Sequence, residues 1–470
     1  MSVLAVHGHF YQPDRRDPTS LLVPRDWTAA PSSNWNARIT AECYDPNVIE
    51  GNLERISFNF GPTLLTWLRE NNPGLHAAVS LAGARGHNAM AQGWHHSILP
   101  LALPRDRQTE IAWGVADFAY RFGHAPAGFW LPECAVDTLT LIDLADAGIR
   151  YVILAPWQLT GALDSRRPYR LELPGDRRMV VMPYDGNLSG EVSFSSDATA
   201  NADHFVRDWV LPKTRPLEDG GEPILLIATD GELYGHHKPY RDWFLRELPA
   251  ATKRAGMRYA TLDQILRELD PATLPQAWLR ENTSWSCHHG VARWSEDCPC
   301  CPDGRWKPVL RSALIELASE LDAVSEAAFA HLGIDLWAVR DQYVTVAAGY
   351  EDPEDFARAA TAGTEHARDP YTAMIVRDLL AAQRSRLAMF TSCAWFWDDP
   401  SRQETVNVLR YAADAIARVR LYTELDAEPA FLAALAPIVS HQTGESGPEL
   451  YWRAVRESSR IVRTRVHASV

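Results

Sequence analysis

The chain has 470 residues, of which 46% are hydrophobic and 23% charged, so it is long enough for two or three domains with a large core. Its net charge of −14 argues against sequence-independent binding to nucleic acid. No apolar run approaches the ~20 residues of a membrane span, and we expect no signal peptide. Seven cysteines are an odd and sparse set for a secreted disulfide framework. We therefore expect a cytoplasmic protein with reduced thiols and no nucleic-acid or membrane partner.

Short apolar segments alternate with helical patterns in the N-terminal part of the chain. The predicted strands, each bounded by Gly, Pro or Asp, are Val3–Val6, Ala78–Leu81, Gly128–Leu131, Tyr151–Ala155, Met179–Met182, Ile224–Ala228 and Tyr259–Thr261. The helices predicted between them include Gly61–Glu70, Asp106–Phe122 and Asp137–Ala147. Such alternation predicts an α/β fold, and about seven strands favour an incomplete (β/α) barrel over a doubly wound sheet.

A loop rich in Cys, Pro and Gly, Cys298–Gly304, interrupts this alternation, and the chain beyond it is helical in pattern. Apolar residues then step by three and four, as on the buried face of a helix: Leu310, Leu314, Leu317, Leu321, Val324 and Ala328. Further helices are predicted over 371–396, 402–425 and 448–462. The sequence thus predicts a barrel domain over 1–297 and an α-helical domain over 298–470.

Polar residues that a buried core does not select follow three of the predicted strands. The first strand runs into His7 and His9. The third runs into Glu133 and the sixth into Asp230. Because the carboxyl ends of parallel strands meet at one face of an α/β fold, we expect these side chains to share a site.

Glu133 and Asp230 are far apart in the sequence, so only the fold can pair them. A carboxylate pair is the machinery of a glycosidase, with one group attacking the anomeric carbon and the other protonating the leaving oxygen. Each residue alone has a structural explanation, since Glu133 suits a helix N-terminus and Asp230–Gly231 suits a turn. The 17 Trp residues fit either sugar-stacking surfaces or a Trp-rich core.

The sequence resembles glycoside hydrolase family 57. Five segments carry this resemblance in the expected order: His7–Pro13, Ser57–Leu65, Trp130–Glu133, Thr229–His236, and Ser284–Ser286 with Gly290 and Trp294. The resemblance implies an incomplete seven-stranded barrel and a retaining enzyme that forms a covalent glycosyl intermediate and needs no metal. It also implies that Glu133 is the nucleophile and Asp230 the general acid/base.

The same resemblance implies roles for further side chains. The substrate contacts that it implies are hydrogen bonds from His7, His9 and His96, stacking on Trp130, Trp285 and Trp294, and polar contacts from Glu42, Glu232 and His236. Asn88 stands where the family usually has a glutamate. The C-terminal part, including Met389–Asp399, resembles a poorly characterised branch of the family.

Metal chemistry is an alternative interpretation of the same residues. His7, His9, Asp230 and the pair His236–His237 could together hold a divalent ion with an open position for water, as in a metal-dependent carbohydrate hydrolase or polysaccharide deacetylase. A second cluster could hold structural zinc or simply be a thiol-rich loop; it comprises Cys287, His288, His289, Cys298, Cys300 and Cys301. Its one C-x₂-C spacing, Cys298 to Cys301, is a weak zinc signature.

The function predicted from the sequence is that of a retaining glycoside hydrolase or glucanotransferase acting on α-glucans or maltooligosaccharides, without a cofactor. A catalytically silent glycan-binding protein is a further alternative. Whether water or another sugar accepts the glycosyl group stays open, as do the linkage and the oligomeric state.

Overall fold

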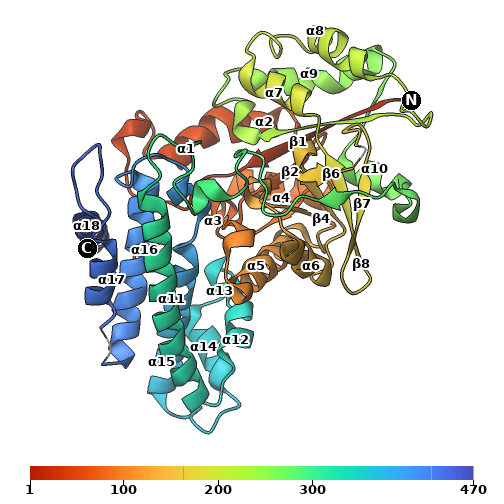
Figure 1. Ribbon diagram of the computed structural model, residues 1–470. Coiled ribbons are helices and arrows are strands. Elements are labelled where there is room, and N and C mark those ends of the chain that lie inside the picture. The colour runs from red at the N-terminus through yellow and green to blue at the C-terminus, as the bar shows by residue number, and fades with distance from the viewer. Residues whose placement is uncertain (162, 425, 469–470) are drawn as a thin grey trace. The chain divides into compact units, whose positions relative to one another are not determined.

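The computed structural model describes residues 1–161, 163–424 and 426–468 and divides the chain into two compact units (Figure 1). The first, which we call the barrel unit, comprises Met1–Gln12, Asp26–Trp94 and Gly114–Ser286. The second, the helical unit, comprises Pro13–Arg25, His95–Trp113 and Cys287–Val470. The predicted domain boundary after residue 297 stays a prediction.

The barrel unit is built on parallel strands. β1 (Val3–Phe10) pairs with β9 (Ile224–Asp230), with β2 (Ser57–Phe60) and with the short β10 (Arg258–Tyr259). A second sheet has the order β3 (Ala91–Gln92), β4 (Gly128–Trp130), β5 (Tyr151–Leu154) and β8 (Arg177–Pro183), with the antiparallel β7 (Tyr169–Leu173) at its edge. The two-residue strands β6 (Leu159–Thr160) and β11 (Trp278–Leu279) form a separate antiparallel pair.

Hydrogen bonds join the two parallel sheets into an open barrel. The Met90 N–H donates to the Phe58 carbonyl at 2.8 Å, which connects the β2 and β3 segments. At the other side, β8 is connected to β9 by the bond from the Asp185 N–H to the Leu226 carbonyl, 2.7 Å, instead of a strand ladder. The parallel order around the barrel is therefore β1, β2, β3, β4, β5, β8, β9. The predicted incomplete seven-stranded barrel is confirmed.

The barrel interior follows the two-residue period of its strands. Val3 and Ala5 of β1 lie in the buried core with Leu226 and Ala228 of β9. Successive side chains of a strand point to opposite faces, so the next inward positions on these strands are those of His7, His9 and Asp230. The apolar core thus gives way to polar side chains at the carboxyl ends of the strands.

Helices surround these strands, and one predicted strand proved wrong. The helices of the barrel unit are α1 (Trp35–Ile39), α2 (Asp45–Ile49), α3 (Pro62–Asn71), α4 (Pro73–Gly86), the second part of α5 (Pro104–Phe122), α6 (Thr138–Asp146), α7 (Gly186–Phe194), α8 (Ala202–Phe205), α9 (Arg241–Arg254) and α10 (Leu262–Glu268). The predicted strand Ala78–Leu81 lies inside α4. Asn72 caps this helix by accepting from the Leu75 N–H, and Pro73 occupies its first turn, so local helix signals outweigh the short apolar run.

The helical unit contains the predicted apolar stripe. Its helices are the first part of α5 (Pro104–Phe122), then α11 (Trp306–His331), α12 (Leu336–Gln342), α13 (Val344–Ala347), α14 (Pro353–Thr361), α15 (Pro370–Ala388), α16 (Gln403–Val419), α17 (Glu428–Leu435) and α18 (Gly447–Ala468). Leu310, Leu314, Leu317 and Leu321 of α11 are buried. Helices α11, α15 and α16 lie side by side in Figure 1 and contact one another.

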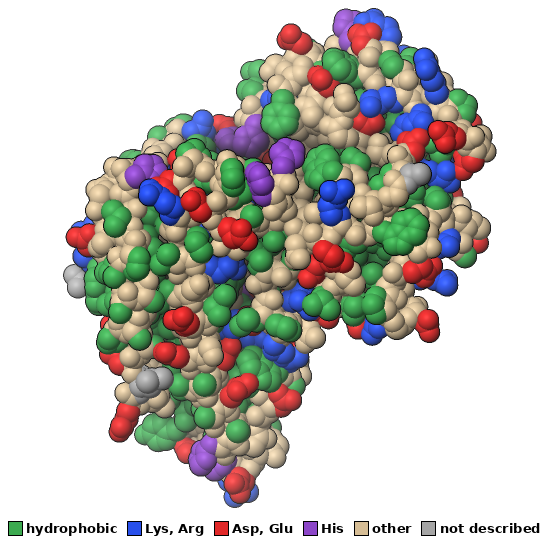
Figure 2. All heavy atoms as spheres, viewed as in Figure 1, with side chains coloured by type: hydrophobic (Ala, Val, Ile, Leu, Met, Phe, Trp, Pro, Cys, Tyr) green, Lys and Arg blue, Asp and Glu red, His purple; other side chains and the backbone are tan. Residues whose placement is uncertain are grey.

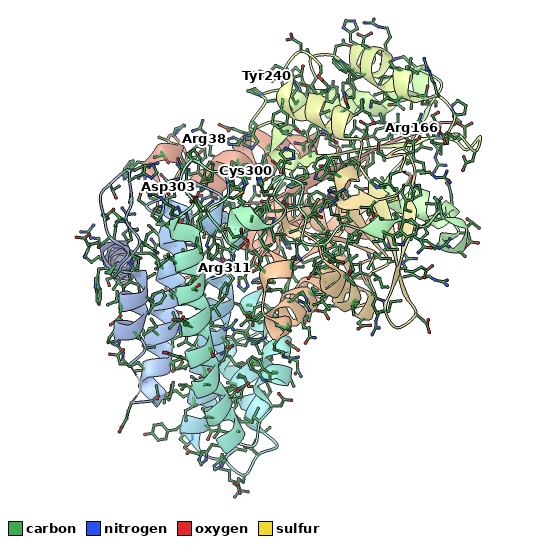
Figure 3. All side chains as sticks on the ribbon, in the orientation of Figure 1. Arg38, Arg166, Tyr240, Cys300, Asp303 and Arg311 are labelled. Atoms are coloured by element: carbon green, nitrogen blue, oxygen red, sulfur yellow. The ribbon has the colours of Figure 1, made fainter. Side chains whose placement is uncertain are left out.

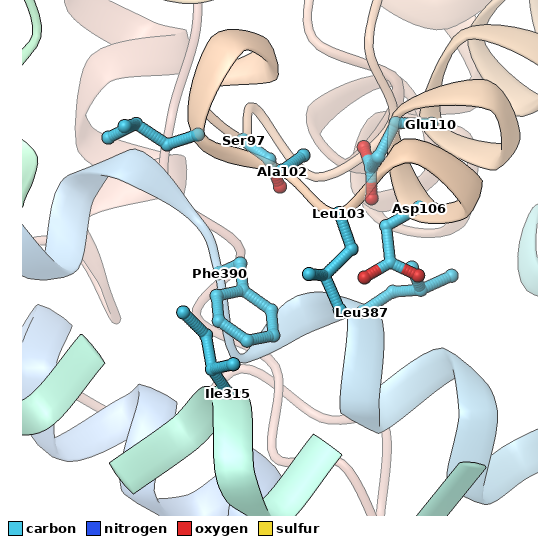
Figure 4. A pocket seen from close by; sticks show the side chains of 9 residues that line it. Ser97, Ala102, Leu103, Asp106, Glu110, Ile315, Leu387 and Phe390 are labelled. Atoms are coloured by element: carbon cyan, nitrogen blue, oxygen red, sulfur yellow. The ribbon is translucent and has the colours of Figure 1, made fainter. Parts of the chain in front are cut away.

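Charged side chains are buried inside this helical unit. Arg386 of α15 pairs with Asp106 of α5 and, at 2.7 Å, with Asp322 of α11. Arg340 of α12 also reaches Asp106, at 3.2 Å. A cavity of about 10 Å³ beside Asp106 is lined by Leu103, Leu387 and Phe390 (Figure 4). It has room for about one water molecule and is too small for a sugar.

Figure 2 shows acidic, basic and apolar side chains interspersed over the helical unit on the face that it presents. Within the described residues, no helix combines the length and the apolar composition that crossing a membrane requires.

Candidate active site

His7, His9 and Asp230 are brought together by strand register. β1 and β9 run parallel with His9 opposite Asp230. On the other side of β1, His9 is opposite Asn59 of β2. Both histidines and the aspartate therefore occupy the carboxyl end of the barrel interior, as the sequence predicted for this group.

Asn59 fixes the orientation of both histidines. His7 Nε2 lies 3.0 Å from Asn59 Oδ1, and Asn59 Nδ2 lies 2.9 Å from His9 Nδ1 and 2.6 Å from Gln92 Oε1. Asn59 Oδ1 can only accept, so His7 donates from Nε2, whereas His9 Nδ1 also lies 3.2 Å from Asn59 Oδ1 and is within reach of both ends of the amide.

Trp130 of β4 forms the floor beneath the two imidazoles. Its ring stacks on His7 and on His9, with centroids 4.8 Å apart in both pairs. Burial lowers the pKa of both histidines to about 3, so each is neutral near pH 7. Trp130 is itself completely buried, so it supports the histidines and presents no open face to a sugar in this structure.

Glu133 follows β4 in an unusual backbone conformation, with φ 57° and ψ 21°. Its carboxylate Oε2 accepts hydrogen bonds from Trp285 Nε1 at 3.1 Å and from Ser286 Oγ at 2.7 Å. The Trp285 backbone N–H also donates to the Glu133 carbonyl, at 3.0 Å. Residues 285 and 286 therefore hold the glutamate through both its backbone and its side chain.

Asp230 is accessible to solvent, yet many protein atoms surround it. These surroundings and, to a smaller extent, the negative charge of Glu133 together raise the pKa of Asp230 to about 7. The two carboxyl groups are therefore close enough to interact electrostatically. Their separation of about 5–5.5 Å, expected for a retaining pair, stays a prediction.

Glu232, two residues after Asp230, is buried and interacts with it electrostatically. It is 4% exposed, and its Oε1 accepts from the Tyr44 hydroxyl at 2.6 Å and from the Tyr11 N–H at 3.0 Å. Burial raises the pKa of Glu232 to about 8, and the charge of Asp230 contributes in the same direction. Glu232 is thus a buried, hydrogen-bonded acid next to the site.

Glu42 and His236 form a separate contact nearer the surface of the barrel unit. Glu42 accepts from His236 Nδ1 at 2.5 Å and from Arg38 Nε at 2.9 Å. Partial burial raises the pKa of Glu42, but the bonds from His236 and Arg38 outweigh it, and the pKa is lowered. Their predicted contact with substrate stays a prediction.

Two predicted substrate contacts belong to the helical unit. His96 Nδ1 lies 2.6 Å from the Ser392 hydroxyl, and the Ser392 N–H donates to the His96 carbonyl. Trp294 is completely buried in that unit, so its ring has no accessible face for stacking in this structure. The predicted roles of both residues therefore gain no support from their surroundings.

Sequence reasoning missed the roles of Asn59, Gln92 and Asn88. Asn59 lies within the segment 57–65 that carried the family resemblance, but only the β1–β2 register reveals its contact with the histidines. Asn88 donates to the carbonyls of Leu53 and Ile56, at 2.6 and 2.5 Å, so it holds the backbone that enters β2.

The proposed metal alternative gains no support from the geometry of the barrel unit. Among the described residues, the one group of His, Cys, Asp or Glu whose ligand atoms lie within 4.8 Å of one another is Cys287, His289, Cys298 and Cys300 of the helical unit. His7 and His9 instead hold Asn59 between them. The site combines neutral imidazoles, a glutamate held by two donors and an aspartic acid of raised pKa, which suits acid/base-assisted displacement at a sugar.

Two protein-family models match this chain. The model described as glycosyl hydrolase family 57 matches residues 35–277, and the one described as a domain of unknown function (DUF3536) matches residues 303–470. Over 246 residues the chain is 24% identical to a 4-alpha-glucanotransferase of Thermococcus litoralis, covering 49% of this chain and 36% of that protein. Over 238 residues it is 25% identical to an alpha-amylase of Pyrococcus horikoshii, covering 49% and 37%. The chain thus spans well under half the length of these curated relatives.

Solved structures resemble the whole fold. An exo-type maltose-forming amylase from Pyrococcus sp. ST04 superposes with a TM-score of 0.75 at 15% identity, over 97% of this chain and 88% of that one. A branching enzyme from Thermococcus kodakaraensis gives a TM-score of 0.61 at 14% identity, over 97% and 94%. At such identities the likeness concerns the fold alone. Because the family match extends over more than half of its residues, the chain belongs to glycosyl hydrolase family 57.

Proposed function

We propose that this chain is a retaining glycoside hydrolase or glucanotransferase that acts on α-glucans or maltooligosaccharides. Family membership and the names of the similar proteins, a 4-alpha-glucanotransferase and an alpha-amylase, support this substrate class. The low cysteine content and the lack of a membrane-spanning helix among the described residues are consistent with cytoplasmic glucan as the substrate.

The observation that carries the proposal is the difference between the two carboxyl groups. Glu133 has two hydrogen-bond donors on one oxygen, which fix its orientation. Asp230 has a pKa of about 7, so a substantial fraction of it is protonated near neutral pH. Two interacting carboxyl groups in such different environments are the arrangement that glycoside hydrolysis uses.

In the first step, Glu133 attacks the anomeric carbon while Asp230 donates its proton to the glycosidic oxygen. The carbon–oxygen bond to the leaving sugar breaks, and a glycosyl ester of Glu133 forms. In the second step, Asp230 removes a proton from water or from a sugar hydroxyl, which attacks the same carbon and releases Glu133. Water gives hydrolysis, and a sugar hydroxyl gives transfer. The neutral imidazoles of His7 and His9 lie beside the reacting groups and form hydrogen bonds with the sugar.

The test is incubation of the wild type, Glu133→Ala and Glu172→Gln with a maltooligosaccharide ladder. Glu172 is a control because it is an exposed β7 residue whose carboxylate pairs with Arg170 and Arg178. We expect the wild type and Glu172→Gln to change the ladder, and Glu133→Ala to be slower by at least about 1000-fold. Shorter products alone mean hydrolysis, and longer products with them mean transfer.

Azide tests the assignment of the two roles. A small anion can enter the space left by Glu133→Ala and attack in its place, so we expect a glycosyl azide of inverted configuration. In Asp230→Ala, azide instead attacks the intermediate on Glu133, and the azide product keeps the configuration of the substrate. Unimpaired turnover by Glu133→Ala, or no wild-type activity on any α-glucan, would overturn the proposal.

A further inference from the structure

Three sulfur atoms and one imidazole nitrogen converge in the loop that precedes α11. Cys287 Sγ lies 3.6 Å from Cys298 Sγ and 3.7 Å from Cys300 Sγ. His289 Nδ1 lies 3.3 Å from Cys300 Sγ and 3.4 Å from Cys298 Sγ. All four residues belong to the helical unit, and Figure 3 labels Cys300 in this loop.

These distances match the edges of a tetrahedron around zinc. With Zn–S near 2.3 Å and Zn–N near 2.0–2.1 Å, a tetrahedral site has edges of about 3.8 Å between sulfurs and about 3.6 Å between sulfur and nitrogen. The observed separations agree to within a few tenths of an ångström. We propose that Cys287, His289, Cys298 and Cys300 bind one Zn²⁺ as a structural site.

The ligand set identifies the kind of site. Thiolate and imidazole ligands favour zinc over hard ions such as Mg²⁺ or Ca²⁺, and four protein ligands leave no position for a catalytic water. Three converging sulfurs also argue against a disulfide, which would join two of them and leave the third. The sulfurs are free thiols in this structure, well beyond the ~2.05 Å of an S–S bond.

Cys301 is excluded from the cluster, although its spacing from Cys298 is the one that the sequence singled out. Its thiol donates to the carbonyls of Trp397 and Asp303, at 3.4 and 3.6 Å. The chain therefore uses Cys298 and Cys300, two residues apart, in place of the expected C-x₂-C pair. This makes Cys301 a matched control from the same loop.

Burial and charge at the cluster are those of a structural metal site. Cys287 and Cys298 are 3% and 1% exposed, whereas His289 is exposed and Cys300 half-buried, so an ion can enter from solvent. Zn²⁺ with three thiolates carries a net charge of −1. The buried ammonium of Lys307 donates to the Arg293 carbonyl at 3.1 Å and interacts electrostatically with Cys301 more strongly than with Cys298. A bound ion would also link Cys287 to Cys298, 11 residues further along the chain, and so stabilise a loop that has little regular structure.

The experiment measures zinc in the full chain, purified without a metal-binding tag under reducing conditions. We expect about one Zn²⁺ per chain in the wild type and in Cys301→Ser, and at least a tenfold lower content in Cys300→Ser and Cys287→Ser. Serine at position 301 keeps a hydroxyl that can donate to the same carbonyls.

A second measurement does not depend on the folding of the cysteine variants. The wild type is stripped of metal with a chelator, kept reduced, and titrated with Co²⁺. A 1:1 complex with strong visible bands and sulfur-to-cobalt charge-transfer absorption supports a tetrahedral thiolate site. Less than a tenth of a zinc per chain together with no cobalt complex would overturn the proposal. A disulfide between Cys287 and Cys298 in protein purified without reductant, unaffected by added zinc, would also overturn it.

Discussion

The backbone at Glu133 stores strain at the site itself. A positive φ costs a residue other than glycine of order 1–2 kcal/mol, and Cys134, with φ 47°, repeats this conformation. The bonds from Trp285 and Ser286 stabilise the conformation from outside the turn. A glycine at position 133 would relieve the backbone strain but would remove the carboxylate. The strain is therefore a cost of holding the carboxylate at this position.

Removing one donor to Glu133 should slow the reaction without unfolding the protein. Ser286→Ala removes the 2.7 Å bond to Oε2, a bond to a charged group worth about 1.5–3 kcal/mol. We expect kcat/KM to fall by about 10- to 150-fold, and Ser286→Thr, which keeps the hydroxyl, to recover most of it. Steady-state kinetics and a thermal melt check this, and a Ser286→Ala enzyme with wild-type kinetics would contradict it.

Asp230 should set the alkaline limit of activity. It must be protonated to donate to the leaving oxygen, and its pKa is raised to about 7. We expect kcat/KM to fall about tenfold per pH unit above that value. The control Glu172→Gln should show the same decrease of kcat/KM above pH 7. Wild-type kcat/KM that stays constant up to pH 9 would contradict the assignment.

At the scale of elements, the two-residue period of the strands accounts for what the sequence could predict. His7, His9 and Asp230 continue the inward positions of β1 and β9, so strand patterns alone placed them at one end of the barrel. The sequence of one strand does not show which residues of a neighbouring strand will lie opposite it. This is why the role of Asn59, which depends on the register of β2 against β1, was missed.

Other misses also have local physical causes. The short apolar run at 78–81 fits a strand or a helix equally well, and the cap at Asn72 decides between them. In the loop before α11, sequence spacing indicated Cys298 with Cys301, whereas the turn points Cys301 toward backbone carbonyls and Cys300 toward the cluster. Side-chain direction in an irregular loop has no period from which it could be predicted.

The acids and histidines at the ends of β1 and β9 should give stability a defined pH dependence. Asp230 and Glu232 bind protons more tightly in the folded state, with pKa values of about 7 and 8, so their contribution to stability falls as pH rises through 4–8. His7 and His9 have folded pKa values of about 3, so their contribution falls as pH drops from about 6.5 toward 3. Between about pH 4.5 and 6.5 the two contributions change in opposite directions and cancel, so the free energy of unfolding should be constant there. It should fall at lower and at higher pH.

Glu232→Gln tests the alkaline part of this dependence. The amide oxygen can still accept from Tyr44 and Tyr11 but has no proton to lose. Urea denaturation at pH 5.5 and 8.5 should show a smaller loss of unfolding free energy in the variant than in the wild type. Equal losses in both proteins would show that Glu232 does not titrate in this range.

For the whole molecule, the important feature is that neither unit is continuous in sequence. The helical unit includes His95–Trp113, and from this segment Asp106 supplies a partner for both buried guanidinium groups, Arg386 and Arg340. These ion pairs therefore join a segment inserted between two stretches of the barrel unit to helices that follow the last of those stretches.

Asp106→Asn should destabilise the helical unit by about 3–5 kcal/mol, because it removes the charge that faces two buried cations. Asp355→Asn is the control, since its pair with Arg358 is exposed and worth under about 1 kcal/mol. Urea denaturation followed by circular dichroism measures both. By the same reasoning, a fragment of residues 298–470 lacks Asp106 and should show no cooperative unfolding transition. A cooperative fragment would contradict the structural role of the 95–113 segment.

The division of the helical unit along the chain also determines how it forms during synthesis. Asp106 leaves the ribosome 280 residues before Arg386. At a synthesis rate of about 5–20 residues per second, Arg386 is added roughly 15–60 s after Asp106, and only then can the two charges pair. During that interval the nascent chain exposes acidic and apolar side chains that are buried in the folded protein. We therefore expect the yield of folded protein in cells to depend on chaperones and on translation speed more than its final stability would suggest.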